Sequence, residues 1–139
     1  MLATVLSAVL LAAAVLPPVA GPVTRGFDPP PVPYAAGHRG VDLDAAPGEA
    51  VRAVLPGVVR FEGTVARVGW VSVDHGGGLV TTYGPLDPRL VAAGGRVRAG
   101  DVLGLVADGS RRLDWGARLH GAYLDPLSLL RPWEPFLLP

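Results

Sequence analysis

A histidine and an aspartate with the chemistry of metal ligands lie close together in the run GHRGVDL, residues 37 to 43. The imidazole of His38 and the carboxylate of Asp42 are ordinary partners in a zinc site, where such ligands bind at about 2.0–2.2 Å from the metal. The pair alone is a weak signal, because His38 could equally cap a turn while Asp42 bonds to the backbone. A metal site also needs at least one further ligand from elsewhere in the chain.

The run RRLDWGARL, residues 111 to 119, contains a second group of candidates. Asp114 is an acceptable metal ligand, and on a strand Arg112 would share its face, because residues two apart point to the same side. The guanidinium of Arg112 stays protonated, so it cannot act as a general base. It could instead stabilise a carbonyl or oxyanion, or it could bridge Asp42 and Asp114 as a fixed cation in place of a metal.

Short β-strands must position these side chains, because no stretch after Gly21 holds a sustained helical period of apolar residues. Short apolar runs are instead bounded by turns rich in glycine and proline. The glycines of HGGG, residues 75 to 78, predict a hairpin turn. The expected strands are Val23–Phe27, Gly40–Leu43, Ala50–Val54, Gly57–Glu62, Trp70–Asp74, Leu79–Tyr83, Asp101–Val106 and Leu113–Leu119. The pattern predicts an all-β sandwich or open barrel.

Length and composition limit the kinds of protein that this chain can be. With 139 residues it holds at most one domain of ordinary size. Twelve basic and twelve acidic residues give a formal net charge of zero, so the chain lacks the basic field of a nucleic-acid-binding protein. The absence of cysteine excludes disulfides, thiolate metal ligands and cysteine nucleophiles.

The N-terminus resembles a secretory signal peptide. Residues 2 to 16 are apolar and uncharged, and Ala20 in the following PPVAGP is a candidate cleavage residue. No basic residue precedes the apolar run, and Pro18 is unfavourable near a cleavage site. An uncleaved anchor reaching to Val23 is therefore the alternative. We predict export with cleavage, and we divide the chain into a leader or anchor (1–20), a β domain (21–130) and a C-terminal tail (131–139).

Several runs occur together in an order that resembles one protein family. They are PVTRGFDPP, GHRGVDLDAAPGEAVRAVLPGVVRFEG, WVSVDHGGGLVTTYGPL, VRAGDVLGLV and LDWGARL followed by YLDPLSLL. Each is unspecific alone, but the set resembles the M23 metallopeptidases, the lysostaphin-like or LytM-type enzymes of bacterial cell walls, over residues 21 to 130. The resemblance implies a single compact antiparallel sheet or open barrel (the duplicated hybrid motif) with a groove. It also implies a zinc ion and metal-assisted hydrolysis of peptidoglycan stem peptides or cross-links.

The resemblance also assigns roles to individual positions. His38 and Asp42 match two zinc ligands, and Asp114 stands at the third ligand position, where the family has histidine. Arg112 and Pro85 stand where the family has two auxiliary histidines that act on the water and the carbonyl. A site of one histidine and two aspartates is harder, so it is less selective for zinc and more tolerant of manganese. Zn²⁺ binding is therefore expected to be weakened or absent, with Mn²⁺ as the alternative.

Other candidates receive structural interpretations. His75 and His120 are expected in turns or at the surface, because their spacing does not replace the missing histidines. Trp70 and Trp115 are expected in the core.

Three hypotheses for function remain open at this stage. The first is a degenerate M23 domain that has weak or no endopeptidase activity and acts as a peptidoglycan binder or as a regulator of another wall hydrolase. The second is a divergent but active metallopeptidase that uses His38, Asp42 and Asp114 for metal, with Arg112 as an electrophilic stabiliser. The third is a purely structural envelope protein.

Overall fold

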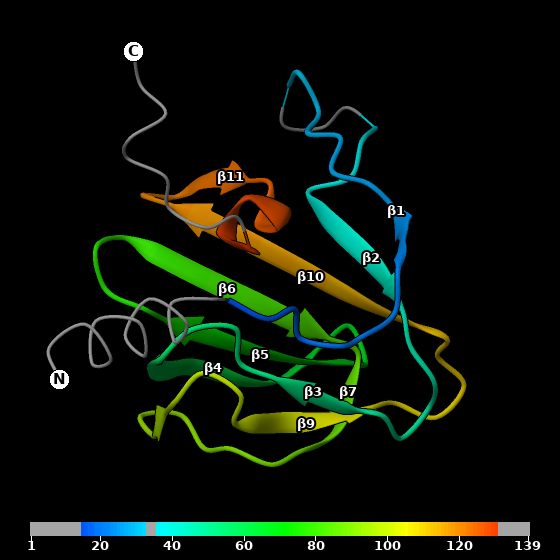
Figure 1. Cartoon of the computed structure of the whole chain (residues 1–139), viewed down its shortest axis with the longest axis vertical. Helices are drawn as coiled ribbons and strands as arrows, with labels where there is room; N and C mark the ends of the chain where they lie inside the picture. Colours follow the sequence, from blue (N-terminus) through cyan, green and yellow to red (C-terminus); the bar gives the residue numbers. More distant parts are fainter. Residues whose placement is uncertain (1–14, 33–35, 131–139) are drawn as a thin grey trace, which may run out of the picture.

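A computed structural model describes residues 15–32 and 36–130 of the chain (Figure 1). Most of the predicted leader, up to residue 14, and the predicted tail from residue 131 lie outside the described residues. Within the described residues, the secondary structure consists of strands and one short 3₁₀ helix, η1 (Pro126–Leu130). No helix in this part of the chain is long and apolar enough to cross a bilayer.

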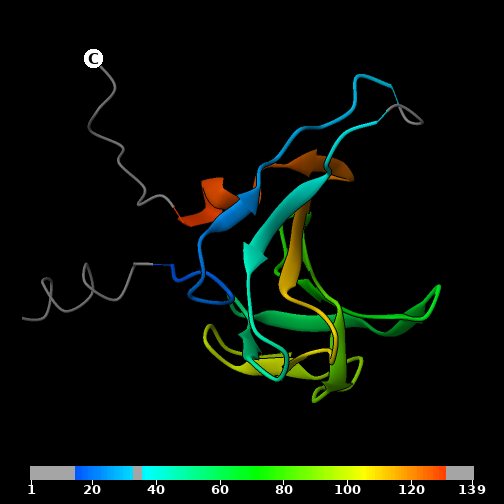
Figure 2. The same ribbon diagram turned by 90° about the vertical axis from the view of Figure 1, so that its right-hand side faces the viewer.

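The larger of two antiparallel sheets carries the candidate site. Its strands follow the spatial order β1-β2-β10-β6-β5-β4-β8, and β11 pairs with the far end of β10. The bounds are β1 Val23–Arg25, β2 Gly40–Asp44, β4 Gly57–Val65, β5 Val68–Asp74, β6 Leu79–Gly84, β8 Arg96–Val97, β10 Arg112–Leu119 and β11 Ala122–Leu124. Figure 2 shows that this sheet is strongly curved, and that β2 and β10 run side by side.

The smaller sheet consists of β3 (Ala50–Arg52), β9 (Val102–Val106) and β7 (Leu86–Arg89), in that spatial order. It lies beneath one end of the larger sheet in Figure 1. The predicted all-β, antiparallel and open architecture is confirmed, with the strands divided between two sheets. The sequence missed the short strands β7, β8 and β11, whereas the equally short β1 and β3 lie within longer runs that were expected as strands.

Alternation along β10 separates the core from the open face of the larger sheet. Leu113, Trp115 and Ala117 are buried, while Arg112 and Arg118 on the opposite face are exposed. This confirms the prediction for Trp115, which is fully buried.

The prediction for Trp70 is wrong, because that residue is only half-buried and lines a pocket on the open face. The inward positions of β5 belong to Val71 and Val73, so the strand register places Trp70 outside the core.

The hairpin predicted at residues 75–78 connects β5 to β6. Gly76, Gly77 and Gly78 all have positive φ, at 81°, 61° and 84°, which explains why three glycines follow one another there. The turn fixes the register of β6, and β6 in turn pairs with β10 beside the candidate site.

The segment that precedes β1 packs into the domain. Val19 is only 5% exposed within the core cluster, and the carbonyl of Pro18 accepts a hydrogen bond from the amide of Arg52 at 3.0 Å. The carbonyl of Pro22 accepts another from the amide of Asp44 at 2.8 Å. The domain boundary after residue 20 stays a prediction, but a cut at that point would remove Val19 from the core.

Candidate metal centre

Two neighbouring strands bring the predicted ligands together. In the antiparallel ladder between β2 and β10, Asp114 is the direct partner of Asp42, and on its other side Asp114 pairs with Gly84 of β6. His38 stands two residues before β2. One ligand atom from each of His38, Asp42 and Asp114 lies within 4.8 Å of the others. Residues separated by more than 70 positions in sequence thus form one cluster of metal-binding groups.

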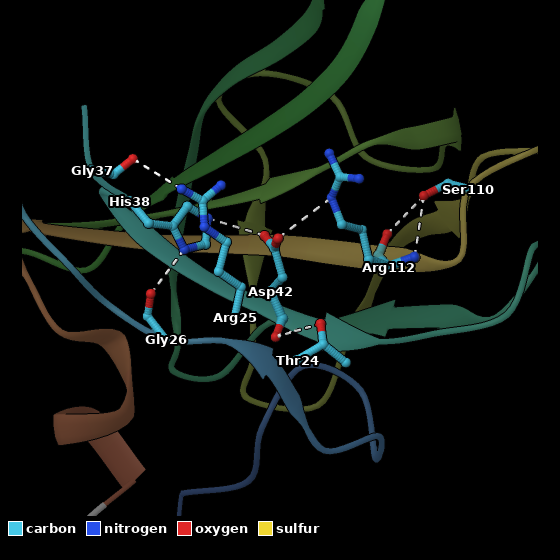
Figure 3. Close-up of polar contacts among 8 residues, drawn as sticks. All are labelled: Thr24, Arg25, Gly26, Gly37, His38, Asp42, Ser110 and Arg112. Atoms are coloured by element: carbon cyan, nitrogen blue, oxygen red, sulfur yellow. Dashed lines mark hydrogen bonds and ion pairs between the residues drawn. The ribbon is translucent and has the colours of Figure 1, made fainter.

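The backbone fixes the orientation of the His38 ring (Figure 3). Its Nδ1 lies 3.0 Å from the carbonyl oxygen of Gly26, which can only accept, so Nδ1 carries the proton and donates it. The other nitrogen, Nε2, therefore faces Asp42 Oδ1 at 3.1 Å. In the neutral imidazole this is a lone pair directed at a carboxylate, an arrangement that requires either a second proton on the ring or a cation.

The carboxylate of Asp42 shows the other side of the same contact. Asp42 is only 7% exposed, and its buried Oδ1 accepts no hydrogen bond from the described residues. A buried carboxylate oxygen without a donor is unfavourable unless a positive charge compensates it. The donor set of His38, Asp42 and Asp114 therefore fits a divalent metal ion.

Arg112 lies on the other side of the same carboxylate (Figure 3). Its Nε is 3.6 Å from Asp42 Oδ2, although its side chain is 63% exposed. The structure thus contains half of the bridge considered from the sequence, because the described ion pair joins Arg112 to Asp42 but not to Asp114. This contact places a guanidinium beside one of the three candidate ligand groups.

The surroundings of Asp114 disfavour the ionised form of its carboxyl group. Burial raises the pKa of Asp114 above its ordinary value, and the neighbouring Asp42 carboxylate raises it further. His38, Arg112 and Arg25 oppose this pKa shift. Two carboxylates paired across a ladder repel each other, so a proton or a metal ion between them would be stabilising.

Arg25 is the part of the site that the sequence did not reveal. It is the register partner of Asp42 on β1, and its guanidinium donates to the carbonyl of Gly37 at 3.2 Å. The only signal would have been the pairing of β1 with β2. That pairing is a tertiary fact, because twelve residues of proline-rich chain separate Arg25 from His38.

The remaining candidates do not join the cluster. Pro85 follows β6 and shares a surface hollow with Arg112, on the rim of the site. His75 Nδ1 lies 2.8 Å from the Pro56 carbonyl oxygen and its Nε2 2.7 Å from Thr81 Oγ1. His120 occupies the exposed turn after β10 with φ of 50°. The turn interpretation of both histidines agrees with these positions.

A comparison with known families identifies the domain. The profile of peptidase family M23 matches residues 36–126, a range that includes His38, Asp42 and Asp114. The chain belongs to peptidase family M23. The geometry above is therefore that of an M23 domain in which His38, Asp42 and Asp114 lie together.

Curated relatives of this M23 domain are longer proteins. An uncharacterised protein of Mycobacterium tuberculosis is 40% identical over 119 residues, which cover 78% of this chain and 47% of the relative. The DD-carboxypeptidase/endopeptidase Mpg of Neisseria meningitidis is 35% identical over 100 residues, which cover 68% of this chain and 23% of the relative. The chain thus spans about half or less of the length of these relatives.

Solved structures support the M23 fold at low sequence identity. Csd3 of Helicobacter pylori matches with a TM-score of 0.74 at 22% identity, covering 85% of this chain and 35% of the other. A zinc-containing peptidase from Vibrio cholerae matches with a TM-score of 0.73 at 23% identity, covering 88% and 41%. A chain of the SpoIIQ–SpoIIIAH pore-forming complex matches with a TM-score of 0.68 at 22% identity, covering 86% and 92%.

Proposed function

We propose that this M23 domain is an exported cell-wall protein that binds peptidoglycan peptides and has weak or no endopeptidase activity, serving as a binder or as a regulator of another wall hydrolase. The observation that carries the proposal is the position of Arg112, whose Nε lies 3.6 Å from Asp42 Oδ2. A permanent cation beside a ligand carboxylate opposes the binding of a dication there. It also partly satisfies that carboxylate without any metal.

The groups available for proton transfer support the same conclusion. Arg112 stays protonated and Pro85 has no titratable atom, so neither can replace a general acid or base. One positioned acid–base residue contributes roughly 10²–10⁴-fold to an enzymatic rate. The lack of two such groups at these positions favours a protein that retains the groove while its hydrolytic rate is low.

A metal ion would be held by His38, Asp42 and Asp114. When bound, it would polarise a substrate carbonyl and lower the pKa of a bound water molecule. Two carboxylate ligands beside one imidazole reduce the preference for zinc, so manganese is the alternative ion. In this chain His38 is oriented by Gly26, while Arg112 would be available to donate hydrogen bonds to a substrate oxygen.

A divergent active metallopeptidase is the second candidate function. It is favoured by the convergence of three ligand atoms within 4.8 Å and by the unsatisfied Oδ1 of Asp42. In that case His38, Asp42 and Asp114 bind the metal, and Arg112 stabilises the developing oxyanion.

One set of measurements on the full chain, prepared without an affinity tag, distinguishes these functions. The protein is offered zinc and manganese, its metal content is measured by mass spectrometry, and it is then mixed with purified cell walls. We expect it to sediment with the walls and to release no soluble fragments. The variant His38→Ala should sediment equally, as should the control His120→Ala, whose side chain lies in an exposed turn.

Fragment release that is lost in His38→Ala but kept in His120→Ala would contradict the proposal and establish the metallopeptidase. If the protein neither sediments with walls nor binds metal, the third hypothesis, a purely structural envelope protein, would be favoured instead.

A further inference from the structure

A pocket of about 190 Å³ opens beside Asp114 on the exposed face of the larger sheet. Its walls include Trp70, Thr82, Arg118 and Tyr123, and Gly40 and Gly116 contribute its floor. A Cβ atom at Gly116 would lie 2.8 Å from Thr82 Oγ1, and one at Gly40 would lie 3.2 Å from Asp114 Oδ1. A Cβ at Gly40 would also lie 2.5 Å from the backbone oxygen of Trp115, so larger residues at these two positions would displace the strands that line the pocket.

The pocket extends from the metal cluster toward the end of β10. Arg118 also lines a second hollow, together with Thr82 and Arg60, so the two hollows are adjacent along the sheet. Asp114 and Arg118 are four positions apart on one strand and share its face. Their Cα atoms are thus separated by roughly 13 Å, which an extended peptide spans with about four residues. A peptide that lies over the candidate metal site would therefore be long enough to reach Arg118 as well.

The guanidinium of Arg118 is held in place by Tyr123. Arg118 Nη2 donates to the Tyr123 hydroxyl at 2.6 Å, and the guanidinium carbon lies 4.5 Å from the centre of the tyrosine ring. The guanidinium carbon of Arg39 lies 5.7 Å from the centre of the same ring. Two cations therefore gather around one aromatic side chain at the far end of the pocket.

Tyr123 holds the Arg118 guanidinium in place, but no acidic side chain of the described residues balances its charge. No carboxylate of the described residues lies within ion-pair distance of Arg118, whereas Arg89 pairs with Glu62 at 2.6 Å and Arg112 contacts Asp42. One hydrogen bond and the contact with the tyrosine ring hold the guanidinium, and a guanidinium has further N–H donors beyond the one used in that bond. Such a guanidinium is suited to recognising a carboxylate.

We propose that this pocket is a subsite for a carboxylate of the bound peptide, with Arg118 as the recognition residue, Tyr123 as its positioning residue and Trp70 as the apolar wall. The inference rests on the proposed function, because it specifies which peptides the groove prefers. Peptides that carry a free carboxylate within about four residues of the segment over His38 and Asp42 bind in preference to peptides that lack one.

The carboxylate can come from an internal residue of a stem peptide or from its C-terminus. The test therefore uses synthetic stem peptides in three forms: all carboxylates free, internal carboxylates amidated, or the C-terminus amidated. Binding to the full chain is measured by calorimetry, for the wild type and for Arg118→Gln. We expect amidation at one of the two sources to weaken wild-type binding by roughly tenfold to a hundredfold, the range for a charge-assisted hydrogen bond.

Matched variants separate recognition from general charge. Arg118→Gln should bind the free and amidated peptides equally, and Arg118→Lys should recover part of the preference because it restores the charge. Arg96→Gln makes the same change in charge on β8, at the opposite end of the strand order from β2, and should behave like the wild type. Near-ultraviolet circular dichroism confirms that each variant is folded.

Two results would overturn the proposal, and they differ in what they imply. If the wild type binds all three peptides with equal affinity, or if Arg118→Gln retains the preference, the subsite is wrong while peptide binding in the groove stands. If none of the peptides binds, the proposed function fails and the subsite fails with it.

Discussion

Asp114 lies directly opposite Asp42 in the ladder between β2 and β10, and both contribute a ligand atom to the same cluster. Like charges paired across an antiparallel ladder are destabilising unless something between them is positive. In this structure His38, Arg112 and Arg25 lower the pKa of Asp114 against the larger effects of burial and Asp42. The repulsion within this pair is the basis for the first two predictions, which concern stability and metal binding.

Replacement of Asp114 by asparagine should raise the free energy of unfolding at pH 7 in the presence of a chelator. The folded-state pKa of Asp114 is raised above 3.8, so its ionisation destabilises the fold at any pH above the raised value. The advantage of Asp114→Asn should shrink as the pH falls toward 3.8, where the wild-type carboxyl is also neutral.

Urea unfolding as a function of pH measures this difference, and the exposed Asp44 provides the control substitution Asp44→Asn. Added manganese should stabilise the wild type more than Asp114→Asn, because only the wild type offers a charged carboxylate at this position. A variant that is less stable than the wild type in chelator at pH 7 would contradict the repulsion between Asp42 and Asp114.

Removal of the guanidinium at position 112 should strengthen metal binding. In Arg112→Gln the cation near Asp42 Oδ2 is lost, so a divalent ion no longer meets a positive charge beside its ligand. We expect the affinity for manganese or zinc to rise by up to about tenfold, an exposed arginine being well screened by solvent. Calorimetric titration measures the change, with Arg96→Gln as the control. A weaker affinity in Arg112→Gln would mean that Arg112 supports the metal site instead of competing with it.

The segment before β1 should contribute to stability. Val19 is 5% exposed in the core, so Val19→Ala should lower the free energy of unfolding by about 2 kcal/mol through lost apolar contact and a small cavity. Val23→Ala is the matched control, because Val23 is 41% exposed. Chemical denaturation of both variants measures the difference. Equal stability of the two would show that residues 18–22 do not form part of the cooperative unit.

Alkaline pH should destabilise the fold through Tyr83. Burial raises the pKa of Tyr83 from 10.0 to about 12, while hydrogen bonds with Thr81 and Val54 oppose the shift. The pKa of Tyr83 is higher in the folded state than in the unfolded state. The contribution of the neutral Tyr83 to stability is therefore complete below pH 10 and is lost as the pH rises toward 12. Within that window the free energy of unfolding should fall by about 1.4 kcal/mol per pH unit.

Tyr83→Phe separates this effect from others. The variant should lose the steep alkaline decline, and it should also be less stable than the wild type at pH 8 by about 1 kcal/mol, because the Tyr83 hydroxyl bonds to Thr81 Oγ1 at 2.8 Å and to the Val54 amide at 3.3 Å. Tyr123→Phe is the control, since Tyr123 is 41% exposed. An unchanged alkaline decline in Tyr83→Phe would assign the effect to another group.

The local sequence determined most of the strands and the set of metal-binding groups. Strand positions follow from alternation and from glycine turns, which are properties of neighbouring residues, so β2, β5, β6 and β10 were predicted close to their observed bounds. The order of the M23-like runs indicated the family, and with it the grouping of His38, Asp42 and Asp114. Strands β7, β8 and β11 were missed because they contain too few residues to show a period and do not lie within longer apolar runs.

The tertiary structure alone decided what surrounds that group. The register of β2 against β10 set Asp42 opposite Asp114, and the pairing of β1 with β2 brought Arg25 to the site. Strand curvature and the register of β5 turned Trp70 to the open face, where it forms a pocket with Arg118 and Tyr123. These relations depend on contacts between segments far apart in the chain, and such contacts are selected by the packing of the whole core, which no local pattern of residues encodes.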